Sequence, residues 1–132
     1  MRIFLLVAFL VFTAATCHKN TATITPAPKL TSNCYKARLE IKGICMNYVI
    51  KVLDGDITKL NIEKEWKDES DGKVYNNVFA LGSRCSFPDL AEGEEFYFVT
   101  TGIEDTNCNV CMAYRPVPPA KNNILVSKTA CP

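Results

Sequence analysis

Residues 34–56 read CYKARLEIKGICMNYVIKVLDGD, and their pattern predicts a β fold. From Tyr35 to Lys42, apolar and charged side chains alternate, which is the pattern of a strand with one buried face. Gly43 permits a bend, residues 44–53 are again rich in apolar and β-branched side chains, and the run 54–56 (DGD) ends them with a turn. Two strands, 35–42 and 44–53, are therefore expected on either side of Gly43.

The rest of the folded region repeats this pattern. Residues 57–67 are ambiguous, because Asp56 could cap a short helix, but we favour a brief turn followed by a strand from about Leu60. The pair Asp71-Gly72 is a strong hairpin signal. Further strands are expected at 74–81, 94–101, 109–114 and 124–128, with a proline-rich loop at 116–119. The prediction is a mainly β fold: a small antiparallel barrel or sandwich of about five to seven strands, with at most one short helix.

The first 16 residues have the layout of a secretory signal peptide. Arg2 gives a positive start, residues 3–12 are unbroken apolar, and residues 13–16 are small. The apolar run is shorter than the roughly 20 residues of a membrane-spanning helix. We therefore expect residues 1–16 to be removed after export.

Cys17 follows the small residues directly, and the run 14–17 (AATC) resembles a bacterial lipobox, whose cysteine becomes lipidated. Thr16 and Ala14 depart from the residues that are usual there. Residues 17–33 would then form the lipidated cysteine and a flexible tether, since they hold two prolines and few large apolar groups. Residues 34–132 remain as a single β domain. This places the protein in the bacterial envelope, lipid-anchored and facing the periplasm, with a soluble secreted protein as the alternative.

The seven cysteines support this division. Without Cys17 the count is six, an even number that suits three disulfides in an oxidising compartment. Six cysteines allow 15 pairings, and the sequence does not choose among them. The candidates for disulfide bonds are Cys34, Cys45, Cys85, Cys108, Cys111 and Cys131.

The cysteine placement and strand order resemble the netrin-like (NTR) module, the OB-type barrel also found in tissue inhibitors of metalloproteinases. The matching features are Cys34 at the start of the first strand, the run 45–50 (CMNYVI), and the later runs 78–85 (VFALGSRC) and 93–98 (GEEFYF), with Cys131 near the end. The resemblance implies a disulfide from Cys45 to Cys131. The whole chain is also similar to small cysteine-containing bacterial lipoproteins.

Catalytic signals in the domain are sparse. The one histidine, His18, falls in the tether, so the domain lacks the residues for Ser-His-Asp or Cys-His catalysis and for histidine-ligated zinc. Cys108 and Cys111 form a Cys-x-x-Cys motif, which can be a redox couple or two members of the disulfide framework. Glu63 and Glu65 share one strand face, as a solvated surface or as paired acids.

Two surfaces are candidates for binding. Four aromatic side chains could form a binding face or could be packing residues: Trp66, Tyr75, Tyr97 and Tyr114. The segment 115–121 is rigid, partly apolar and charged at both ends, and is the candidate interaction loop. Its residues in that role are Arg115, Pro116, Pro118, Pro119 and Lys121.

These observations favour a membrane-anchored, non-enzymatic lipoprotein that binds a protein or envelope component. The formal charge of +1 gives no electrostatic basis for binding nucleic acid, and no cofactor or metal site is expected. The alternative is a thiol–disulfide oxidoreductase that uses Cys108 and Cys111.

Overall fold

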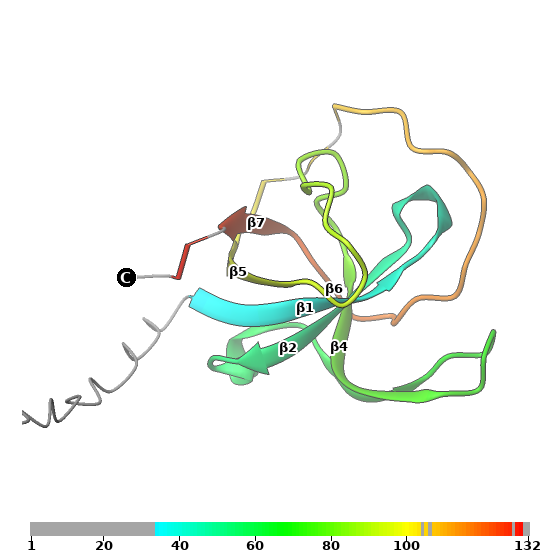
Figure 1. Ribbon diagram of the computed structural model, residues 1–132, viewed down its shortest axis with the longest axis horizontal. Helices are drawn as coiled ribbons and strands as arrows, with labels where there is room; N and C mark the ends of the chain where they lie inside the picture. Colours follow the sequence, from blue (N-terminus) through cyan, green and yellow to red (C-terminus); the bar gives the residue numbers. More distant parts are fainter. Residues whose placement is uncertain (1–33, 104, 106, 128, 131–132) are drawn as a thin grey trace, which may run out of the picture.

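The computed structural model describes residues 34–103, 105, 107–127 and 129–130. The predictions for the signal peptide, Cys17, the tether and Cys131 lie outside these residues. Within them the chain forms seven strands and two short 3-10 turns (Figure 1). These are β1 (Cys34–Lys42), η1 (Ile44–Met46), β2 (Tyr48–Asp54), η2 (Ile57–Lys59), β3 (Glu63–Lys67), β4 (Val74–Leu81), β5 (Glu95–Thr100), β6 (Lys121–Asn122) and β7 (Ile124–Ser127).

The strands form one sheet in the order β3-β4-β2-β1-β5-β7. All neighbours on this path are antiparallel, which confirms the expected mainly β, antiparallel fold of five to seven strands, and only the two-residue strand β6 pairs in parallel, with β4. The path does not close into a barrel. However, only Asn123 separates β6 from β7, and the two strands pair with β4 and β5 respectively. The run 121–127 therefore links two strands that are far apart along the sheet path.

One large apolar cluster fills the interior of the curved sheet. The alternation read from the sequence is confirmed, because Tyr35, Ala37 and Leu39 of β1 are buried while the residues between them are half-buried. Phe96 and Phe98 of β5 are buried in the same cluster. The other strands and loops contribute Ile50, Val52, Leu60, Phe79, Leu81, Phe87, Leu90, Ala120 and Ile124.

A second, smaller cluster lies beside the β3–β4 hairpin. The register of β1 against β2 shifts between Leu39 and Ile41, and Ile41 then packs with Val49 and Val78 instead of with the main core. Trp66 and Tyr75, paired across the hairpin, lie against this cluster with ring centres 5.8 Å apart. The hairpin is thereby attached to the sheet by packing as well as by backbone hydrogen bonds.

The strand expected at residues 44–53 begins later, at Tyr48. Residues 44–46 form η1, in which Cys45 and Met46 have positive φ angles of 55° and 56°. A side chain on Gly43 would clash with the carbonyl oxygen of Asn47, so this close turn requires glycine there. The apolar pattern alone favoured a strand, but the sharp turn after β1 leaves Ile44 60% exposed.

The structure also differs from the expected strands at residues 57–67 and 109–114. Asp56 caps η2 by accepting a hydrogen bond from the Thr58 amide at 3.2 Å, so the helical alternative for residues 57–60 holds locally and the strand β3 starts only at Glu63. The strand expected at 109–114 does not form. That segment contains no strand, and Cys111 within it is joined by a disulfide to Cys45 in the turn after β1.

Candidate functional site

The longest connection in the domain is the site that stands out. Residues 101–120 join β5 to β6, and their described part contains no helix or strand. Structureless loops of this length are usually functional or disordered. In Figure 1 the orange part of this loop passes close to the turn between β1 and β2. Within its described residues, the disulfides of Cys108 and Cys111 and the ion pair of Arg115 hold the loop in place.

Two disulfides fasten the loop to the body of the domain. Cys108 is bonded to Cys85, with the Cα atoms 5.4 Å apart, and Cys111 is bonded to Cys45, with the Cα atoms 5.1 Å apart. Cys108 and Cys111 are thus members of the disulfide framework and not a redox couple with each other. The expected bond from Cys45 to Cys131 is also wrong, because Cys45 pairs with Cys111.

Cys34, at the start of β1, is disulfide-bonded as well. Disulfides form and persist in oxidising environments and are rare in the cytosol. The bonds of this domain therefore indicate an oxidising compartment outside the cytoplasm. Within the described ranges no helix is long and apolar enough to cross a membrane.

Hydrogen bonds reinforce the link between the loop and η1. The side-chain amide of Asn47 donates to the carbonyl oxygen of Ile44 at 2.8 Å and to that of Ala113 at 2.9 Å. Asn47 is almost fully buried, so these two bonds satisfy both of its donors where water has little access. The turn after β1 and the segment beyond Cys111 are held as one unit.

An ion pair fastens the far end of the loop to the β3–β4 hairpin. The Arg115 guanidinium lies 2.7 Å from the Asp68 carboxylate, which is completely buried. Burial alone would raise the pKa of Asp68. Hydrogen bonds from the hydroxyl and amide of Ser70 and the charge of Arg115 outweigh burial, and they hold this pKa below its usual value of 3.8.

The interaction loop expected at 115–121 is therefore only partly exposed. Arg115 and Pro116 are half-buried, Pro118 is fully buried, and Val117 packs against the second cluster. Pro119 and Lys121 are exposed. The sequence suggested an exposed loop because it could not show the contact with Asp68, which lies 47 positions earlier in the chain.

The exposed apolar side chains of this region lie earlier in the loop. Met112 is 96% exposed, Tyr114 is 83% exposed and Ile103 is 72% exposed. Sequence reasoning missed Met112 and Ile103, and it treated Tyr114 only as part of a wider aromatic face. The available signal was the position of Met112 and Tyr114, which are large apolar residues directly after Cys111 in a segment followed by prolines, whereas no such signal marked Ile103.

A pocket of about 190 Å³ opens between this loop and the turn after β1. It is lined by Asn47, Arg84, Cys111, Met112, Ala113 and Tyr114. Arg84 is its one charged residue, and the buried Nε atom of Arg84 has no hydrogen-bond acceptor in the described part of the chain. The backbone strain at Cys45 lies next to this pocket, and strained residues of this kind cluster at functional sites.

The remaining candidates are spread over the molecule. Trp66 and Tyr75 form a packed pair and Tyr97 lies on β5, so the four aromatic residues do not form one face. Glu63 and Glu65 lie on β3 as expected, with Glu63 half-buried and Glu65 exposed. Among the residues that the structure describes, no group of three or more histidine, cysteine or acidic side chains could hold a metal ion.

Comparison of the chain with protein-family models, with curated proteins and with solved structures finds no match.

Proposed function

We propose that this protein is a lipid-anchored, non-enzymatic binding protein of the bacterial envelope, and that residues 107–115 dock a protein partner. The observation that carries the proposal is the nearly complete exposure of Met112 and Tyr114 on a loop held by two disulfides. Methionine and tyrosine are enriched at protein interfaces. A loop that is already ordered loses less conformational entropy on binding than a mobile one.

The size of the pocket favours a macromolecular partner over a small-molecule ligand. Sites for drug-sized ligands enclose about 300–1,000 Å³. The pocket beside Cys111 encloses about 190 Å³, which suits one side chain of a partner. The flanking residues Met112 and Tyr114 would supply the apolar contact area around that side chain.

The resemblance to NTR and OB-type domains supports the same location. OB folds are five-stranded, partly open barrels whose loops after the first and fourth strands contribute to ligand binding. If β1, β2, β4, β5 and the run 121–127 are taken as those five strands, the two loops are residues 43–47 and 101–120. These are the loops that the Cys45–Cys111 disulfide joins.

Site-specific photo-crosslinking in native envelopes tests the proposal. A photoreactive residue is placed at position 112 or 114 in the full chain, and at Leu53 as a control, because Leu53 is also exposed but lies near the opposite end of β2. We expect one discrete cross-linked protein from positions 112 and 114 and none from position 53. Equal labelling from all three positions would contradict the proposal.

A further inference from the structure

We infer that the pocket beside Cys111 binds the carboxylate of an aspartate or glutamate side chain on the partner, and that Arg84 is the residue that receives it. The inference rests on the proposed function and adds that the partner presents an acidic side chain to the pocket. It starts from Arg84, which lies three residues beyond the end of β4 and next to Cys85.

The environment of Arg84 leaves its side chain unmatched. Its backbone amide donates to the carbonyl oxygen of Gly82 at 2.9 Å, but the buried Nε has no acceptor in the described residues. Buried polar groups in folded proteins are nearly always hydrogen-bonded, so an orphaned donor calls for an explanation. Arg84 also lines the adjoining pocket, so an acceptor that enters the pocket approaches this guanidinium.

The contrast with the other arginines of the domain is informative. Arg115 is paired with Asp68 at 2.7 Å, and Arg38 is paired with Glu40 at 2.7 Å. No ion pair joins Arg84 to any acid within the part of the chain that the structure describes. None of the described residues that line the pocket is acidic, so the pocket carries the positive charge of Arg84 without a partner.

The geometry favours a carboxylate over a phosphate. Phosphorylated and highly acidic motifs are recognised by clusters of arginines, and this pocket has one. A single guanidinium matches a single carboxylate, because its fork of N–H groups donates two parallel hydrogen bonds to the two oxygens. The side-chain amide of Asn47 has no hydrogen left to donate to a ligand, because both of its hydrogens are bonded to carbonyl oxygens.

The experiment uses random 12-residue peptides displayed on phage and selected against the intact domain. Displayed peptides are fused at their C-terminus, so any carboxylate that is selected comes from a side chain. The best peptide is made as a C-terminal amide, with a second version in which the selected acid is replaced by glutamine. Dissociation constants are measured for the wild type, Arg84→Gln and the control Arg38→Gln.

We expect an acidic residue to be enriched among apolar ones in the selected peptides. Arg84→Gln should weaken binding roughly tenfold to hundredfold, which corresponds to the loss of one hydrogen-bonded charge pair. The glutamine peptide should lose a similar factor against the wild type and nothing further against Arg84→Gln, whereas Arg38→Gln should bind normally. In the wild type, the NMR signal of the Arg84 Nε–H group should shift when peptide is added, a readout that does not depend on a variant folding.

The outcomes separate the two proposals. Equal affinity of the wild type and Arg84→Gln, an unmoved Nε–H signal, or selected peptides without an acid would overturn the carboxylate site. A double variant, Met112→Ser with Tyr114→Ser, tests the docking loop in the same assay. If that variant binds every selected peptide as the wild type does, the proposed docking surface itself is wrong. If only the double variant loses binding, the docking surface is supported and the proposed role of Arg84 is wrong.

Discussion

The carboxylate of Asp68 connects two parts of the chain that are otherwise joined mainly by apolar contacts. Among the described residues it is the one charged side chain that is buried, and it accepts hydrogen bonds from Ser70 and Arg115. Arg115 is 21% exposed, so its own charge stays partly solvated. The ion pair fixes the end of the 101–120 loop against the hairpin. Because Arg115 is partly solvated, the free energy lost when Asp68 no longer pairs with it is limited.

Replacement of Asp68 by asparagine tests this role through pH. The pKa of Asp68 is depressed in the folded state, so the carboxylate stabilises the fold fully above its unfolded pKa of about 4. That stabilisation is lost as the pH falls below 4 and through the folded pKa. At pH 7 we expect Asp68→Asn to lower the free energy of unfolding by about 2 kcal/mol in urea titrations.

The difference between Asp68→Asn and the wild type should shrink steadily between pH 4 and pH 2. Glu69→Gln is the matched control, because Glu69 is an exposed acid in the same turn, and it should change stability little at either pH. A difference that is the same at pH 7 and pH 2 would show that the charge of Asp68 does not stabilise the fold.

At the scale of elements, the strands with clear alternation were predictable and the loop was not. The strands at 34–42, 74–81, 95–100 and 124–127 lie close to their expected positions, and each places apolar side chains such as Leu39, Phe79, Phe98 and Ile124 in the main core. The segments 44–47 and 109–114 have the same local preference for strand. The two segments are joined by the bond between Cys45 and Cys111, a contact across 66 positions that no local pattern encodes.

In the candidate site, too, local features were predictable from the sequence and long-range contacts were not. The sequence indicated that Cys108 and Cys111 belong to a disulfide framework, and it singled out the segment that contains Arg115. It did not show that Arg115 faces a buried acid, or that Arg84 lines a pocket beside Cys111. Those relations depend on which cysteines pair and on how the loop returns over the turn after β1.

Removal of the Cys45–Cys111 bond should release the loop while the sheet persists. In the chain-entropy description, this bond closes a loop of 66 residues and stabilises the fold by about 4 kcal/mol, and Cys85–Cys108, which closes 23, by about 3 kcal/mol. In the double variant Cys45→Ser with Cys111→Ser, we expect faster amide hydrogen exchange in residues 107–115, with the amides of β1, β2 and β5 still protected.

The double variant Cys85→Ser with Cys108→Ser serves as the comparison for that experiment. It leaves the link between the loop and η1 intact, so exchange around Met112 should stay closer to that of the wild type. Unchanged exchange at 109–114 in the variant without Cys45–Cys111 would show that hydrogen bonds such as that of Asn47 are enough to hold the loop.

In the whole molecule as we propose it, the folded domain is joined to a lipid anchor at Cys17. Lipid chains contribute about 0.8 kcal/mol for each buried CH₂, so several chains on one residue hold a protein stably at a membrane. We expect the full chain, expressed with residues 1–16 in a Gram-negative host, to sediment with membranes, and Cys17→Ser to stay in the soluble periplasmic fraction.

Thr21→Ser is the control for Cys17→Ser, because it is a conservative change in the same segment, and it should sediment like the wild type. Intact-mass measurement of the membrane form should show a mature chain that starts at Cys17 and carries added acyl mass. A soluble wild type with an unmodified Cys17 would exclude the lipid anchor. The proposal for the docking loop does not depend on that result.

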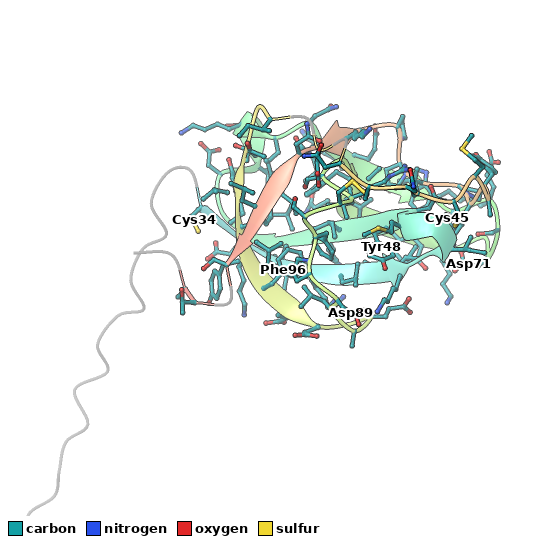
Figure 2. The ribbon with its side chains drawn as sticks, turned by 90° about the horizontal axis from the view of Figure 1, so that it is seen from above. Cys34, Cys45, Tyr48, Asp71, Asp89 and Phe96 are labelled. Atoms are coloured by element: carbon teal, nitrogen blue, oxygen red, sulfur yellow. A yellow bond between two sulfur atoms is a disulfide. The ribbon has the colours of Figure 1, made fainter. Side chains whose placement is uncertain are left out.

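The two ends of β1 give the molecule a direction. Cys34 lies at one end of the domain and Cys45 at the other (Figure 2), and the nine residues of β1 span roughly 30 Å between them. An anchor at Cys17 enters at the Cys34 end, so the docking loop would be presented on the side away from the bilayer. Sixteen intervening residues extend to at most about 50 Å. The loop could then sample a zone up to about 80 Å above the membrane, which would let one anchored molecule search for partners across much of the periplasmic space.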